Sequence, residues 1–204
     1  MNELPPQRIH RILNKLSEAR TRKLACFGSE KHRFRLNPRL DEAALRRFET
    51  AHSIELPADY RAFLQHAGNG GAGPYYGIYP LGKWNDFASW VLDVVPDNVL
   101  SSPSPLQPGC NEGLETESDV GRLAVCQGTL SIGTQGCTYA TQLIVSGLQR
   151  GRVSYVDADH LRPPYVMRDH DFLAWYERWL DELLGGYETS WFGFGPAASK
   201  RKAG

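Results

Sequence analysis

The chain has 204 residues, 41% of them hydrophobic and 11% aromatic, and its formal net charge is zero. This composition excludes an intrinsically disordered chain and is typical of a globular protein with one sizeable core. No apolar stretch is long enough to span a bilayer, and the N-terminus lacks the apolar region of a signal peptide. We therefore expect a cytoplasmic protein.

The first predicted element is an amphipathic helix over residues 5–24. Its apolar residues recur with helical spacing and form one stripe, which consists of Ile9, Ile12, Leu13 and Leu16. We expect this stripe to dock on the rest of the chain. The alternative is a basic helix that lies on a membrane, for which four apolar residues are few. Residues 25–39 follow as a predicted connector.

The zero net charge hides an uneven distribution. Residues 1–39 contain ten Lys/Arg and three Asp/Glu. Residues 40–199, in contrast, contain ten Lys/Arg and twenty Asp/Glu. Three more cations follow at Lys200, Arg201 and Lys202. An acidic body favours encounter with a basic partner through long-range attraction. In the alternative, the basic ends fold over the body and neutralise it, and the sequence favours neither.

Two further helices are predicted between residues 41 and 67. Asp41 is a suitable N-cap for the first helix, and Pro57 suits the first turn of the second. The residues expected on their buried faces are Ala44, Leu45 and Phe48 in the first helix and Tyr60, Phe63, Leu64 and Ala67 in the second. We expect Gly68 to end the second helix in a left-handed conformation.

The segment from Ile54 to Leu81 contains a distinctive series of motifs: Leu56-Pro57, Asp59-Tyr60, Phe63-Leu64, Gly68-Asn69-Gly70-Gly71 and the aromatic run to Leu81. In this combination it resembles the signature of the SUKH superfamily, which contains the fungal Smi/Knr cell-wall regulators and many bacterial toxin-immunity proteins. The resemblance extends over roughly residues 41–184. The resemblance implies an α+β fold and, in bacteria, the binding and neutralisation of a partner toxin. It supplies no catalytic residues.

The middle of the chain contains the candidate partner contacts. An apolar stretch from Trp84 to Val95 is compatible with either helix or strand, and residues 96–121 predict a long acidic loop. Loops of this length are usually functional or disordered. The candidate partner-binding residues are Trp84, Asp86, Glu112, Glu115, Glu117 and Asp119. The alternative is a buried Trp84 and a loop that is merely solvated.

From residue 122 onward the pattern predicts short antiparallel strands. The apolar runs 123–126, 130–132, 139–145 and 153–156 are separated by turns that contain glycine. Connections this short require antiparallel neighbours, so we expect a meander of roughly four to six strands. Residues 169–184 predict a closing helix that packs across the sheet and ends at Gly185-Gly186. The aromatic tail 191–194 is expected to contact the body, and the basic end to fray.

The sequence also contains weaker candidates for chemistry. The four cysteines are scattered and predict free thiols. Cys137, His160 and Asp169 stand in the order of a thiol hydrolase, although a core cysteine is the commoner use of such a residue. Two Asp/His groups, at residues 157–160 and 169–171, could supply metal ligands, but each lies where an Asp ordinarily caps a strand or helix end. We predict no metal and no cofactor.

These observations predict an α+β fold: an antiparallel meander with helices packed against it and an N-terminal helical extension. The expected parts are a basic extension (1–39), a SUKH-like domain (40–186) and an aromatic then basic tail (187–204). The expected function is non-enzymatic binding of a protein partner, a toxin domain with a basic surface such as a nuclease, without direct nucleic-acid or membrane binding. The alternatives are a regulatory or assembly module like the fungal relatives and the thiol hydrolase.

Overall fold

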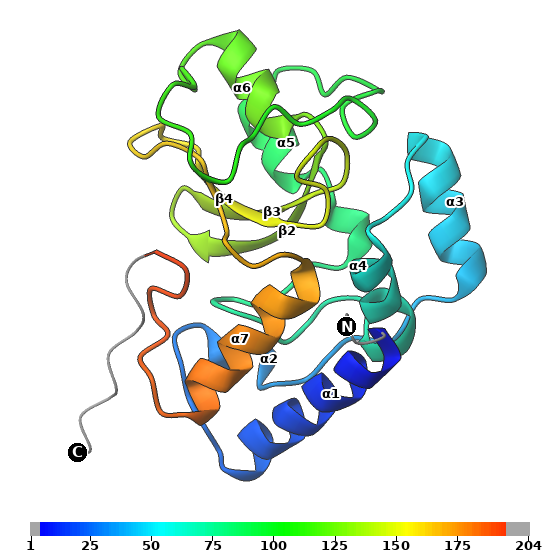
Figure 1. The fold of residues 1–204 in the computed structure, drawn as a ribbon, viewed down its shortest axis with the longest axis vertical. Helices are drawn as coiled ribbons and strands as arrows, with labels where there is room; N and C mark the ends of the chain where they lie inside the picture. The colour runs from blue at the N-terminus through cyan, green and yellow to red at the C-terminus, as the bar shows by residue number, and fades with distance from the viewer. Residues whose placement is uncertain (1–4, 195–204) are drawn as a thin grey trace.

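The computed structural model describes residues 5–194, so the basic cluster at Lys200–Lys202 lies outside the described residues. Figure 1 shows the strands in the middle of the molecule, with helices α5 and α6 at one end and helices α1 and α7 at the other. The predicted α+β architecture is confirmed.

The sheet has five antiparallel strands in the order β1-β5-β4-β3-β2. Its centre is the predicted meander of β2 (Thr129–Gly136), β3 (Tyr139–Ile144) and β4 (Val153–Asp157). Two further strands, β5 (Tyr165–Val166) and β1 (Gly109–Cys110), are added on the side of β4, and each is two residues long. Two-residue strands are too short to show an alternating pattern, so the sequence did not indicate them.

Five of the seven α-helices in the described residues precede the first strand, one lies between β1 and β2, and one follows the last strand. They are α1 (Pro5–Thr21), α2 (Ser29–His32), α3 (Glu42–His52), α4 (Ala58–Ala62), α5 (Asp86–Val91), α6 (Asp119–Cys126) and α7 (Phe172–Leu184). A π-helical turn, η1 (Phe63–Ala67), continues α4, and a short 3-10 helix, η2 (Leu81–Lys83), precedes α5. None of the described helices combines the length and apolar character needed to cross a membrane.

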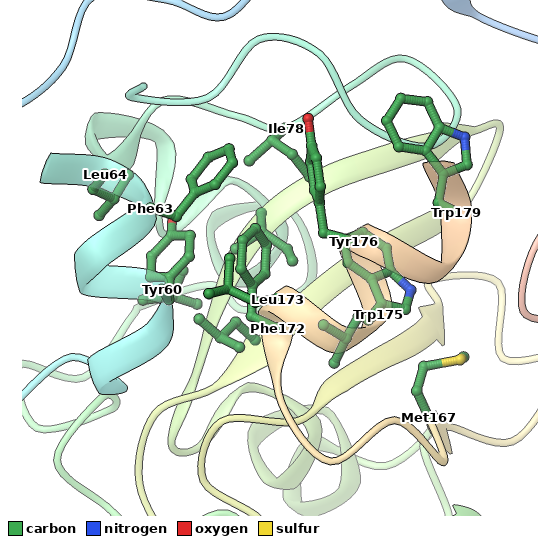
Figure 2. Packing of buried hydrophobic residues seen from close by; sticks show 14 of the residues in the cluster. Tyr60, Phe63, Leu64, Ile78, Met167, Phe172, Leu173, Trp175, Tyr176 and Trp179 are labelled. Carbon is green, nitrogen blue, oxygen red and sulfur yellow. The ribbon is translucent and has the colours of Figure 1, made fainter. Parts of the chain in front are cut away.

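Helix α7 supplies the centre of the hydrophobic core. Figure 2 shows its aromatic side chains beside those of α4 and η1. Tyr176 is fully buried and donates a hydrogen bond to the carbonyl oxygen of Ala72 at 2.6 Å, and Trp175 donates to the hydroxyl of Tyr155 at 3.2 Å. These polar ends are satisfied inside the core, which is the condition for burying Tyr and Trp without cost.

Helix α1 docks on the rest of the chain as predicted, and the structure shows that α7 is the helix it packs against, with one correction to its buried stripe. The buried residues of α1 are Ile9, Ile12, Leu16 and Ala19. Leu13 was assigned to this stripe but is 37% exposed, because the stripe continues through Ala19 and leaves Leu13 at its edge.

Three basic side chains of α1 are paired with carboxylates of α7 and of its N-cap, Asp171. Arg8 contacts Asp171 at 2.6 Å, Arg11 contacts Glu177 at 2.7 Å, and Lys15 contacts Glu177 at 2.8 Å and Asp181 at 2.6 Å. For this helix, the alternative in which the basic end neutralises the acidic body is the one that the structure supports.

The end of the Pro57 helix differs from the prediction. Gly68 has an extended backbone (φ 174°), and its N–H bonds to the carbonyl oxygen of Phe63 at 3.0 Å, five residues back. A Cβ at Gly68 would lie 2.6 Å from the carbonyl oxygen of Asn37. Glycine is therefore required there by close backbone approach, while Gly70 and Gly71 take the positive φ angles.

Residues 123–126 form the end of α6, not a strand. Ser118 caps this helix: its hydroxyl accepts a hydrogen bond from the N–H of Gly121 at 3.1 Å. A cap at the start of the segment outweighs the β-type composition of its end. Helix α3, in contrast, begins where predicted, and Asp41 accepts from the N–H of Ala44 at 2.7 Å.

Candidate interaction surface

Residues 84–121, which we call the acidic segment, contain seven acids and no Lys, Arg or His. All seven are exposed: Asp86, Asp93, Asp97, Glu112, Glu115, Glu117 and Asp119. Unlike the carboxylates of α7, they meet few cations. Asp119 pairs with Arg122 at 3.1 Å, while in the described structure Asp93, Asp97, Glu115 and Glu117 have no ion pair. The segment thus presents uncompensated negative charge to solvent.

Strand β2 holds the start of the acidic segment. The N–H of Ser131 donates to the carbonyl oxygen of Trp84 at 2.6 Å, and the hydroxyl of Ser131 accepts from the N–H of Phe87 at 2.9 Å. Phe87 and Ala88 are buried against the core. These contacts fix the orientation of α5, and Asp86 at its first turn is exposed.

Helix α6 contacts α5 and holds the end of the acidic segment. Gly121 lies against the backbone of the preceding turn, so closely that a Cβ there would overlap the carbonyl oxygen of Glu115. The N-cap Ser118 also donates its hydroxyl to that carbonyl oxygen at 2.9 Å. This turn fixes the backbone that carries Glu115, Glu117 and Asp119.

The long loop between α5 and α6 is anchored rather than loose. Val99 and Leu100 are buried, and the carbonyl oxygen of Val99 accepts from Gly128 at 2.7 Å. Leu106 packs with Ile144 of β3 in a small separate cluster. A loop that is held at two points loses little further entropy when a partner binds it.

Three exposed apolar side chains lie among these carboxylates. They are Trp90 (56% exposed), Val94 (79%) and Val120 (79%). The sequence does not indicate that Trp90 is exposed, because α5 is only six residues long and its sequence allows no unambiguous helical face. Trp is enriched at protein interfaces relative to the rest of a protein surface, and an exposed Trp is a candidate contact residue.

The candidate partner-binding residues named from the sequence differ in their burial and in their neighbours. Trp84 is half-buried and packs edge-on against His52 and Phe48 of α3, with ring centroids 4.4 Å and 6.3 Å away. Of the two tryptophans in the acidic segment, Trp90 is therefore the exposed one. Glu112 lies beside Cys110 on β1, where burial and then the Glu112 carboxylate raise the pKa of the Cys110 thiol. Asp86, Glu115, Glu117 and Asp119 belong to α5, α6 and the turn before α6.

The thiol hydrolase arrangement is not assembled in residues 5–194. Both carboxylate oxygens of Asp169 accept hydrogen bonds from Arg178, at 2.9 Å and 2.8 Å. The Nδ1 atom of His160 is buried without a hydrogen-bond partner. Cys137 is exposed in the β2–β3 turn. No contact connects His160 to either of the other two groups, so the proton relay that activates such a thiol is missing.

The two Asp/His groups act as caps. The Oδ1 atom of Asp157 accepts from the hydroxyl of Thr138 at 2.6 Å and from the N–H of Asp159 at 3.2 Å. Asp171 accepts from the N–H of Ala174 at 2.7 Å and so caps α7. Among the described residues, no three His, Cys, Asp or Glu side chains are grouped as metal ligands.

A groove of about 910 Å³ lies beside β5 and α7. Its lining includes Arg162, Tyr165, Arg168, Arg178 and Phe194. Arg178 is held by Asp169 and by Glu182 at 2.9 Å, so its charge is compensated. Arg162 and Arg168 are exposed.

Comparison with known proteins identifies the fold of the acidic end. The model of the SMI1/KNR4 family (SUKH-1) matches residues 39–140, one half of the chain. This range begins just before α3 and contains the whole acidic segment. No curated protein and no solved structure gave a match. The chain belongs to the SMI1/KNR4 family (SUKH-1).

Proposed function

We propose that this chain is a non-enzymatic protein-binding module that neutralises a cognate toxin. One observation above all supports this function: the 38 residues of the acidic segment carry seven exposed carboxylates and no Lys, Arg or His, and within residues 5–194 Asp119 is the only one of the seven in an ion pair. Membership of the SUKH-1 family, whose bacterial members are typically immunity proteins, supports the same function.

The proposed mechanism has an electrostatic step and a packing step. The uncompensated acids attract a basic surface at a distance and orient it during encounter. Trp90 then inserts as an apolar anchor, surrounded by carboxylates that pair with partner Arg or Lys. A toxin that binds a polyanionic substrate, such as a nuclease, presents a basic groove of this kind. Occupation of that groove by the acidic segment would exclude the substrate.

The assembly alternative finds less support in the packing of α1. That hypothesis uses the basic N-terminal helix to dock a larger complex. The cations Arg8, Arg11 and Lys15 are already paired with α7, and the apolar stripe is buried. Docking another protein through this helix would require those contacts to break.

The test begins with the tagged chain purified from its host and its stoichiometric partner identified by mass spectrometry. We expect a basic toxin domain whose activity is lost on binding. Affinity should then be measured for Asp93→Asn/Asp97→Asn and for the control Glu55→Gln/Asp159→Asn, which removes two exposed acids outside the acidic segment. The first pair should weaken binding and reduce its salt dependence, and the control should not.

Two outcomes would contradict different parts of the proposal. Equal affinity for the two double variants would show that the acidic segment is not the interface. A tight partner whose activity is unchanged in the complex would leave the interface intact and overturn neutralisation.

A further inference from the structure

The segment that begins at the last residues of α1 and runs through α2 carries charge of the opposite sign to the acidic segment. Residues 20–35 contain six cations (Arg20, Arg22, Lys23, Lys31, Arg33 and Arg35) and one acid, Glu30. This segment precedes the range that matches the family, so the function common to the family does not account for it. Figure 1 shows it running beside α7, away from the end of the molecule that carries α5 and α6.

Four of these cations surround a hollow of about 450 Å³: Arg20, Lys23, Arg33 and Arg35. They come from two directions, the last turns of α1 and the stretch that follows α2. The hollow is also lined by Ala19 and Phe34, both buried, and the acid on its lining is Glu30. The hollow is open to solvent, and its four cations are exposed.

The backbone around the hollow is held in an uncommon conformation. Lys23, Arg33 and Phe34 all have left-handed φ angles, of 51°, 50° and 55°. The turn is fixed by hydrogen bonds: the N–H of Arg33 donates to the carbonyl oxygen of Ser29 at 2.7 Å, and Arg20 donates to that of Phe34 at 3.3 Å. Arg33 is the C-cap of α2, and a left-handed residue commonly ends a helix, so this geometry fixes the direction in which the chain leaves α2 toward the hollow.

Three of the four cations at the hollow lack partners of their own. Within residues 5–194, the side chains of Lys23, Arg33 and Arg35 make neither an ion pair nor a hydrogen bond. Arg8 and Arg61, by contrast, are paired with carboxylates. The C-terminal dipole of α1 favours Lys23 at its position. It does not explain why two arginines from beyond α2 line the same hollow.

We propose that this hollow is a binding site for a diphosphate group, either free or attached to a nucleoside. Guanidinium groups bind phosphate oxygens in pairs, and several unpaired cations around one small volume suit an anion with more than one charge. The proposal is independent of toxin binding, because it uses residues at a different end of the molecule.

The test is calorimetric titration of the full chain with inorganic pyrophosphate and, separately, with adenosine diphosphate. Binding of both assigns the diphosphate as the recognised group, and binding of the nucleotide alone would overturn that assignment. The test variant is Arg33→Asn/Arg35→Gln, in which Asn suits the left-handed position. We expect it to weaken pyrophosphate binding about tenfold or more.

The control is Arg162→Gln/Arg168→Gln, which removes two exposed arginines from the groove beside β5. It should bind pyrophosphate as the wild type does. Equal weakening by the two double variants would show non-specific charge attraction and overturn the proposal, as would a wild-type chain that binds no pyrophosphate. Melting temperatures without ligand, expected to be equal for all three chains, show that the variants are folded.

Discussion

Arg8 and Asp171 join the first and last helices of the fold through two hydrogen bonds of 2.6 Å and 2.7 Å. Asp171 is at the same time the N-cap of α7. One side chain thus starts the helix that forms the centre of the core and fastens α1 against it. Burial alone would raise the pKa of Asp171, but the hydrogen bond from Arg8 lowers it.

The first prediction separates these two roles of Asp171. Asp171→Ala removes both cap and ion pair and should lower the free energy of unfolding by about 3 kcal/mol. Asp171→Asn keeps a good N-cap and should cost less, close to the effect of Arg8→Ala, about 2 kcal/mol. Urea unfolding of the three variants measures the difference. Equal losses for Asp171→Ala and Asp171→Asn would contradict the capping role.

The second prediction concerns acid stability. The hydrogen bond from Arg11 lowers the pKa of Glu177 to about 2, against the opposing effect of partial burial, and Lys15 adds to the lowering. Because this folded-state pKa lies below the ordinary value of 4.5, the stabilisation is complete above pH 4.5 and is lost as the pH falls toward 2. Asp59, whose pKa is raised by burial, acts in the opposite sense.

Urea unfolding between neutral pH and pH 2 checks this prediction. Glu177→Gln should be less stable than the wild type at neutral pH and should lose less stability on acidification. Glu55→Gln removes an exposed acid and should keep the wild-type pH profile. A Glu177→Gln profile parallel to that of the wild type would show that the ion pairs of Glu177 with Arg11 and Lys15 contribute nothing to acid stability.

The extent to which the fold follows from the sequence depends on how local each signal is. The cap at Asp41 and the stripe through Tyr60, Phe63 and Leu64 act within one or two helical turns, and both were predicted correctly. Residues 123–126 were assigned wrongly because their β-type composition was weighed without the cap at Ser118, five residues earlier.

The candidate surface was predictable in its charge but not in its geometry. Exposure of the acids follows from their chemistry. The distinction between Trp84, packed on His52, and Trp90, exposed on α5, depends on the contacts of α3 with the segment beside β2. Likewise, the cations Lys23 and Arg33 line one hollow only because α1 and the stretch after α2 fold together. Such long-range contacts leave no pattern in the local sequence.

The third prediction concerns the glycine that positions the acidic turn. Gly121→Ala should destabilise the chain by about 1–3 kcal/mol, because its Cβ would overlap the carbonyl oxygen of Glu115. Gly113→Ala is the matched control in the same loop, since no atom lies within 4 Å of a Cβ there. Chemical unfolding measures both. Equal stability of the two variants would show that the turn before α6 rearranges freely and does not hold Glu115 in place.

The last prediction compares the two tryptophans at the acidic end. Trp84→Ala removes the packing against Phe48 and His52 and should lower the free energy of unfolding by about 2 kcal/mol or more. Trp90→Ala removes a mostly exposed side chain and should leave stability nearly unchanged. If Trp90 anchors the partner, however, the same change should cost about 2 kcal/mol of binding, a roughly thirtyfold weaker affinity. The free energy of unfolding and the partner affinity should be measured on both variants. We expect Trp84→Ala to lose more stability and Trp90→Ala to lose affinity while keeping its stability. A Trp90→Ala chain that binds its partner like the wild type would remove the apolar anchor from the proposed mechanism and leave charge attraction alone to account for affinity.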